Sequence, residues 1–210
     1  MAHHRRAVAA AALLNTAIVL GEAGLGVRAR SLSLLMDGIH NLSDELALVC
    51  LYAAFLLPRT PGRHAQRTAN LLNSAGLIGM SALLVVQALE RLVDPMPVSG
   101  LAPILGGLAA SAGNWGVARL LRAPARVSAS VHLAYVHNLG DVLVSLVPAA
   151  AGLLVVVTGR PLFDALLALG TAVWLMITTA RALRLRREDL VWPEAMTCGH
   201  DRGISTPSVG

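Results

Sequence analysis

The sequence contains no lysine and only two cysteines, Cys50 in an apolar run and Cys198 near the C-terminus. Two cysteines so far apart provide neither a metal-type pair nor a disulfide framework. Basic charge comes from 17 arginines alone, and these fall in the gaps between apolar runs. Arginines distributed in this way are typical of a membrane topology signal and not of a nucleic-acid-binding face. We therefore expect no nucleic-acid partner.

Charged residues of either sign are also scarce. They make up only 14% of the 210 residues, whereas 55% are hydrophobic and the mean hydropathy is +0.64. A soluble domain carries about 25% charged residues. The composition therefore predicts an integral membrane protein.

Six apolar segments have the length of a bilayer span, which is about 20 residues. They cover residues 8–27, 33–57, 70–93, 99–121, 130–157 and 162–183, with proline, glycine and arginine in the gaps. The first segment is too long for a signal peptide, so we expect it to be retained as a helix. The predicted fold class is an all-α membrane protein, with a six-helix transmembrane bundle at 1–187. We expect the short tail at 188–210 to be cytoplasmic and partly disordered.

The arginines also orient the predicted bundle. Two lie at the N-terminus, three in the second gap, three in the fourth and five in the tail, against four in the remaining gaps. Because cytoplasmic loops carry the excess of arginine and lysine, both termini are predicted to be cytoplasmic.

One short pattern occurs twice, as His40-Asn41-Leu42-Ser43-Asp44 in the second segment and His137-Asn138-Leu139-Gly140-Asp141 in the fifth. The four-residue spacing places the imidazole and the carboxylate on one face of a helix. Two such helices facing each other would supply two nitrogens and two oxygens, the ligand count of a tetrahedral zinc site. A single pair would equally fit a packing hydrogen bond, but its repetition in the middle helix of each half favours a metal site. Three spans per half would make the two helices antiparallel, an arrangement that many transporters use around a midplane site.

Other polar side chains in the apolar segments leave alternatives open. Asp37 lies on the His40 face and could accept a hydrogen bond from a ligand, carry protons, bind the entering metal or be a charge at the helix start near the outer membrane interface. Glu22 could line the cavity or form a structural polar contact with Asn15 or another helix. We expect Glu45 to contact a neighbouring helix, and Asn41 and Asn138 to form interhelical hydrogen bonds. Of the remaining histidines, His132 is expected to be solvated, and His3, His4 and the Cys198–His200 cluster are too isolated to indicate a site.

Several stretches resemble the cation diffusion facilitator family of divalent-metal exporters. Residues 31–44, SLSLLMDGIHNLSD, resemble the second-helix signature of that family. The motif from His137 to Asp141, followed by Ser145, resembles its fifth helix. Weaker matches are Asn15, Glu22 and Gly26 in the first helix, Asn73 and residues 90–95 in the third, and the turn at 159–164. The resemblance covers about residues 10–193.

The resemblance implies a secondary transporter, not an enzyme, that exports a divalent cation by proton antiport. Its metal site would lie between the second and fifth helices, with His40, Asp44, His137 and Asp141 as ligands. Paired His and Asp on both helices resemble the zinc and cadmium members, so we expect Zn²⁺ as the transported ion, with Cd²⁺ and Co²⁺ as further candidates. The resemblance also implies a homodimer embedded in the lipid of a bacterial cytoplasmic (inner) membrane.

Family members usually continue into a cytoplasmic, ferredoxin-like metal-binding domain, whereas this chain stops about twenty residues after the last span. Three alternatives therefore stay open. The chain could be a metal-binding membrane subunit of a larger exporter. It could be an intramembrane metallohydrolase, which would need an open zinc position and a general base. It could also bind haem through His40 and His137, although the paired carboxylates would then have no role.

Overall fold

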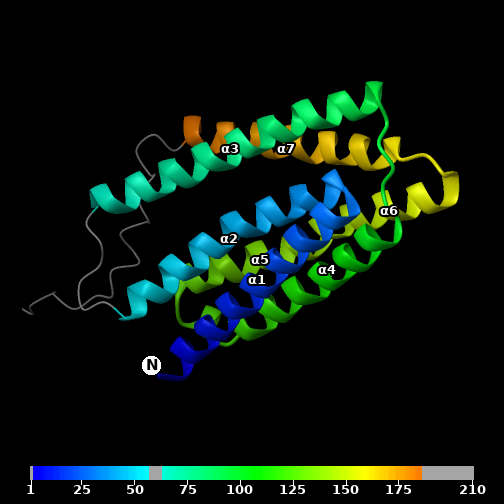
Figure 1. The fold of residues 1–210 in the computed structure, drawn as a ribbon. Helices are drawn as coiled ribbons and strands as arrows, with labels where there is room; N and C mark the ends of the chain where they lie inside the picture. The colour runs from blue at the N-terminus through cyan, green and yellow to red at the C-terminus, as the bar shows by residue number, and fades with distance from the viewer. Residues whose placement is uncertain (1, 57–62, 186–210) are drawn as a thin grey trace, which may run out of the picture.

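The computed structural model describes residues 2–56 and 63–185, and all regular structure in these two ranges is helical. The α-helices are α1 (Ala2–Ala29), α2 (Leu32–Leu56), α3 (Arg63–Val93), α4 (Leu101–Leu121), α5 (Ala129–Val144), α6 (Leu146–Thr158) and α7 (Leu162–Leu185) (Figure 1). A 3₁₀ turn, Pro124–Arg126, joins α4 to α5. The all-helical prediction is confirmed; the tail expected at 188–210 lies outside the described residues.

The fifth predicted segment is two helices, because α5 ends at Val144 and α6 begins at Leu146. Pro148 has no backbone N–H and cannot bond to the carbonyl of Val144, so the helix is interrupted just before it. The hydroxyl of Ser111 on α4 donates to the carbonyl of Val142 at 2.7 Å. The break lies at Ser145, four residues after Asp141, the last residue of the second His–Asp motif.

Four stretches of the described helices are long and apolar enough to cross a membrane: Arg5–Ala29, Ser74–Val93, Val131–Thr158 and Leu162–Arg181. Helices α2 and α4 do not meet the same criterion of length and composition. The polar side chains that lower their hydropathy include Asp37, Asp44 and Glu45 on α2 and Asn114 on α4, and all four are buried. These side chains face the interior of the protein, so they do not meet the surroundings of the bundle.

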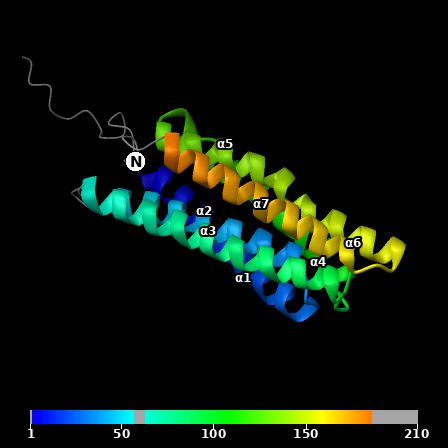
Figure 2. The same ribbon diagram turned by 90° about the horizontal axis from the view of Figure 1, so that it is seen from above.

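The helices form a main bundle and a separate helix pair (Figures 1 and 2). In the main bundle, α1 packs along α2 and α4, and α4 packs along α5 and α6. The helix pair consists of α3 and α7, which pack along each other and touch the main bundle chiefly through α2 and α6. Apolar contacts join the two parts, with Leu32 and Met36 of α2 packed among residues of α3 and α7 such as Leu84 and Ala168.

A buried carboxylate ties α2 to the helix pair at one end. Asp164, in the first turn of α7, is fully buried and accepts hydrogen bonds from the hydroxyls of Ser31 and Ser33. It also accepts from the backbone N–H of Leu32 at 2.7 Å and of Ser33 at 3.4 Å. Because the first N–H groups of a helix have no partner within the helix, Asp164 caps α2 from another helix.

Small residues allow α4 and α6 to approach closely. A Cβ at Gly107 would lie 2.7 Å from the carbonyl oxygen of Ser145 and 2.8 Å from the backbone nitrogen of Ala149. At Gly152 it would clash with the carbonyl oxygen of Gly100. Close backbone approach at small residues is the usual basis of helix association in membranes.

We expect Gly107→Ala to destabilise the fold by about 1–3 kcal/mol, because the new methyl group meets backbone atoms that cannot move aside independently. Unfolding of the purified protein in detergent measures the effect. The matched control is Gly170→Ala on α7, where a Cβ has no atom within 4 Å. Equal stability of the two variants would show that α4 and α6 do not pack this closely.

Candidate metal centre

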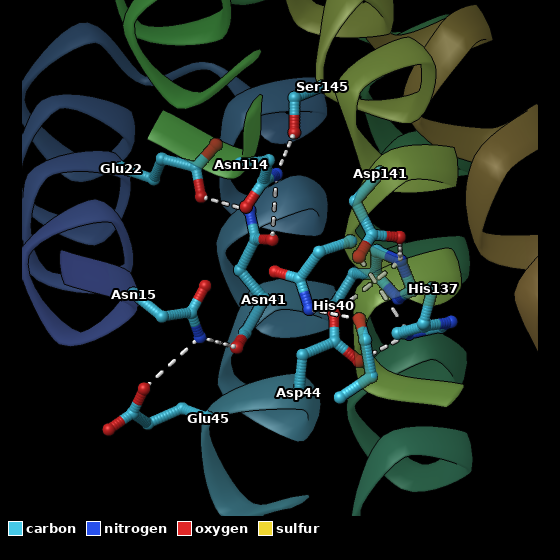
Figure 3. A network of polar contacts seen from close by, with 12 residues as sticks. Asn15, Glu22, His40, Asn41, Asp44, Glu45, Asn114, His137, Asp141 and Ser145 are labelled. Carbon is cyan, nitrogen blue, oxygen red and sulfur yellow. Dashed lines mark hydrogen bonds and ion pairs between the residues drawn. The ribbon is translucent and has the colours of Figure 1, made fainter. Parts of the chain in front are cut away.

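The four side chains of the repeated motif meet between α2 and α5 (Figure 3). His40 Nε2 lies 3.1 Å from Asp141 Oδ1, and His137 Nε2 lies 2.7 Å from Asp44 Oδ1. The separations within each helix, His40 to Asp44 and His137 to Asp141, are both 3.8 Å. Each imidazole is thus closest to the carboxylate of the other helix. Since the first residue of one motif faces the last residue of the other, α2 and α5 are antiparallel here.

The dimensions of the cluster fit a small tetrahedral cation. One ligand atom from each of the four residues can be chosen so that all lie within 4.8 Å of one another. Zinc bonded to nitrogen and oxygen at about 2.0–2.1 Å would hold its ligand atoms about 3.3 Å apart. The separations of 2.7, 3.1 and 3.8 Å bracket that value. A haem is a poor fit, because the carboxylate oxygens occupy the space that a macrocycle between the imidazoles would need.

Burial within the cluster is unequal. His40, Asp44 and Asp141 are only 6%, 7% and 3% exposed, whereas the His137 side chain is 50% exposed. The second carboxylate oxygens of Asp44 and Asp141 are buried and accept no hydrogen bond from the described residues. Buried carboxylate oxygens without donors are costly unless a positive charge compensates them. The cluster therefore offers a cation free acceptor sites, with an opening beside His137.

A polar network lies beside the cluster and joins four helices. The Asn41 amide donates to Glu22 Oε2 on α1 at 2.7 Å (Figure 3). Asn114 on α4 donates to Asn41 Oδ1 at 3.3 Å and to the hydroxyl of Ser145 at 3.0 Å. The interhelical role predicted for Asn41 is confirmed. Asn114 was not predicted, although a fully buried asparagine in an apolar helix is a recognisable signal of such bonding.

The remaining polar residues divide between confirmed and corrected predictions. Glu45 contacts a neighbouring helix as predicted, since its two oxygens accept from Thr16 at 2.7 Å and from Asn15 at 3.2 Å. Asn138 is buried, but its amide donates to the carbonyl of Ala134 on its own helix. A bond within α5 thus takes the place of the interhelical bond that was expected for Asn138.

The two acidic residues with open roles are both buried. Asp37 is 2% exposed, so it is not a solvent-exposed charge. Glu22 is also 2% exposed and accepts from Asn41 of α2, which is a polar contact with another helix, one of the two roles considered for it. His132 is exposed, as expected of a solvated histidine, and its ring lies 6.3 Å from that of Tyr135.

Comparison with known proteins relates this sequence to one family. The sequence matches the profile of the cation efflux transmembrane domain over residues 8–191. The zinc transporter ZitB of Pectobacterium atrosepticum is 30% identical over 169 residues, which are 76% of this chain and 53% of that protein.

Two further relatives are also named for the metal cations that they carry. A cadmium, cobalt and zinc/H(+)-K(+) antiporter of Bacillus subtilis is 26% identical over 157 residues, 70% of this chain and 50% of its own length. The metal cation efflux system protein CzcD of Cupriavidus metallidurans is 24% identical over 185 residues, 84% of this chain and 58% of its own. The chain thus spans about half the length of the curated relatives it matches.

Proposed function

The chain belongs to the cation efflux family of membrane transporters, and on this premise we propose that it exports a divalent metal cation, Zn²⁺ first, in exchange for protons. The observation that carries the proposal is the convergence of His40, Asp44, His137 and Asp141, which two distant segments bring within 4.8 Å of one another. These four residues are proposed as the ligands of the transported ion.

The choice of metal follows from the donor atoms. Two imidazole nitrogens and two carboxylate oxygens suit zinc and cobalt, whereas an all-oxygen site would suit manganese or magnesium. The relatives are named for zinc, cadmium and cobalt, which supports Zn²⁺ as the first candidate and Cd²⁺ and Co²⁺ as alternatives.

The proposed topology has six spans, with α5 and α6 acting together as the fifth. Because Asp37, Asp44 and Glu45 are buried inside the protein, α2 can cross the bilayer despite its polar residues. The arginine distribution supports cytoplasmic termini. A homodimer in the lipid of a bacterial inner membrane is proposed from the family resemblance.

The proposed exchange rests on competition between metal and protons for the same ligands. Metal requires neutral imidazole and ionised carboxylate, so protons and metal exclude each other. With an ordinary pKa of about 6.5, histidine makes this competition effective near neutral pH. When protons occupy the ligands, each imidazole already has a carboxylate partner on the opposite helix at 3.1 or 2.7 Å. The metal-free centre is therefore held together without the ion.

Release of the ion by separation of the two ligand pairs would break hydrogen bonds in the main bundle. Asn114 of α4 donates both to Asn41 of α2 and to Ser145 between α5 and α6. Among the described residues, contacts between the main bundle and the helix pair are mostly apolar, and the polar ones are the Asp164 cap and the hydrogen bond that the Arg91 guanidinium donates to the carbonyl of Arg30. We therefore assign the change of access to movement of the main bundle against α3 and α7, which keeps the four ligands together.

Zinc uptake into everted membrane vesicles tests the proposal. An imposed pH gradient, acid inside, should drive zinc into vesicles that contain the parent protein, and Asp44→Ala should reduce uptake to the level of empty vesicles. The control variant is Asp94→Ala, at an exposed position after α3, which should transport like the parent. Undiminished transport by Asp44→Ala would contradict the site. Zinc binding without flux from the protein alone would favour the membrane-subunit alternative.

A further inference from the structure

A second pair of acidic side chains lies beside the metal centre and supplies none of its ligands. Glu22 of α1 and Asp37 of α2 are each 2% exposed. Asp37 precedes His40 by three residues, about 4.5 Å along the helix axis. A Cβ at Gly38 would lie 3.2 Å from the Cβ of Glu22. The glycine thus allows α1 and α2 to approach closely where the two carboxyl groups meet.

The pair is short of hydrogen-bond donors. Glu22 Oε2 accepts from the Asn41 amide at 2.7 Å. Glu22 Oε1 and both oxygens of Asp37 are buried and accept nothing from the described residues in hydrogen-bond geometry. The two carboxyl groups lie within hydrogen-bonding reach of each other, but ionised carboxylates are acceptors only. The two carboxyl groups can therefore form a hydrogen bond with each other only if one of them carries a proton.

The neighbouring side chains do not supply the positive charge that would let both acids stay ionised. From α2, Asp37 and Asn41 face Glu22. Asp37 is faced by Glu22 from α1, by His40 from its own helix, by Asp141 from α5 and by Ser145 between α5 and α6. Neither acid forms an ion pair with an arginine within the ranges 2–56 and 63–185. Two adjacent carboxylates in a medium of low polarity do not both stay ionised.

We propose that Glu22 carries a proton, which it donates to the carboxylate of Asp37, and that this proton is released when a divalent cation binds beside it. This inference rests on the proposed metal/proton exchange. In the metal-free state, neutral Glu22 hydrogen-bonds to ionised Asp37. Binding of the cation places two positive charges one helical turn from Asp37. The cation then stabilises the ionised Asp37 in place of the hydrogen bond from Glu22. The O–H bond of Glu22 breaks, both carboxylates are ionised, and one proton passes to water for each cation bound.

The contrast with Glu45 supports this assignment. Glu45 is also buried on this bundle, but both of its oxygens have donors, the Thr16 hydroxyl at 2.7 Å and the Asn15 amide at 3.2 Å. An ionised Glu45 is thus satisfied without a proton. Glu22 differs from Glu45 in two respects: it lies beside a second acidic side chain, Asp37, and its Oε1 accepts no hydrogen bond from the described residues.

Calorimetry of zinc binding to the full-length protein in detergent tests the inference. The dependence of the binding enthalpy on the ionisation enthalpy of the buffer gives the number of protons released per zinc ion. Glu22→Gln should release about one proton fewer than the parent, because glutamine has none to lose. Glu45→Gln, the matched control, should release as many as the parent.

The outcomes separate this inference from the proposed function. If the parent binds no zinc, the proposed function fails. If the parent and Glu22→Gln both bind zinc and release equal numbers of protons, the proton on Glu22 is excluded while the metal site stands.

Infrared spectroscopy of the parent gives a readout that does not depend on a variant folding. A C=O stretch of a protonated carboxyl group should be present without metal and disappear on addition of zinc. Its absence from the metal-free protein would overturn the inference.

Discussion

Replacing Asp141 by alanine is expected to weaken zinc binding by the purified protein by a factor of at least about 100, since even residues that only support metal ligands change affinity by about 10–100-fold. Asp141 is one of the four proposed ligands and is 3% exposed, so water does not readily take its place. Its carboxylate is also the closest one to His40, with Oδ1 lying 3.1 Å from His40 Nε2. The variant therefore loses one ligand and the partner that orients another.

Competition with a zinc-binding dye at constant pH measures the loss for Asp141→Ala. Asp141→Asn keeps one oxygen in place but removes the charge, and it should fall between the parent and the alanine variant. Glu45→Gln, beside Asp44 but bonded to α1, should retain the affinity of the parent. An affinity of Asp141→Ala within tenfold of the parent would remove Asp141 from the set of ligands.

Replacing Asp164 by alanine is expected to lower the free energy of unfolding by about 3–5 kcal/mol, the range found when a buried charged group loses its partners. Asp164 accepts from two hydroxyls and two backbone N–H groups at the start of α2. Without it, the two backbone N–H groups lose this acceptor and the two hydroxyls can bond only to each other, across the 3.2 Å that separates them. Each buried group left unpaired costs about 1–3 kcal/mol.

Denaturant or thermal unfolding in detergent checks the effect of the Asp164 substitution. Asp164→Asn keeps one carbonyl oxygen and should lose less stability than the alanine variant. Asp94→Ala removes an exposed carboxylate after α3 and should change stability little. A loss below about 1 kcal/mol for Asp164→Ala would show that the α2 cap is not a main contact between α2 and the helix pair.

The sequence was sufficient to predict the helices and the four proposed ligands, for a physical reason. Apolar runs of spanning length are visible in consecutive residues, and they predict where the helices lie. The four-residue spacing of His40 and Asp44 places both side chains on one face of a helix. The same spacing says nothing about contacts between helices. That each imidazole is closest to the carboxylate of the other helix is a property of how α2 and α5 pack.

Other features depended on tertiary contacts that local pattern does not contain. The cap formed by Asp164 joins residues more than 130 positions apart. The role of Asp37 was undecided because its position on α2 suits both an exposed and a buried carboxylate, and only packing against α1 decides between them. The break between α5 and α6 did have a local signal, because Pro148 interrupts the hydrogen bonding of a helix. Hydropathy alone does not detect this effect.

The unequal burial of the four side chains has a kinetic consequence. In the proposed transport, a hydrated cation that reaches the centre would meet His137 first, because this side chain is half exposed while the other three are almost entirely covered. It would exchange one water molecule for this imidazole and lose the rest stepwise as Asp44, His40 and Asp141 replaced them. His137 would then govern how fast the ion is captured and released, whereas the three covered groups would govern how long it stays.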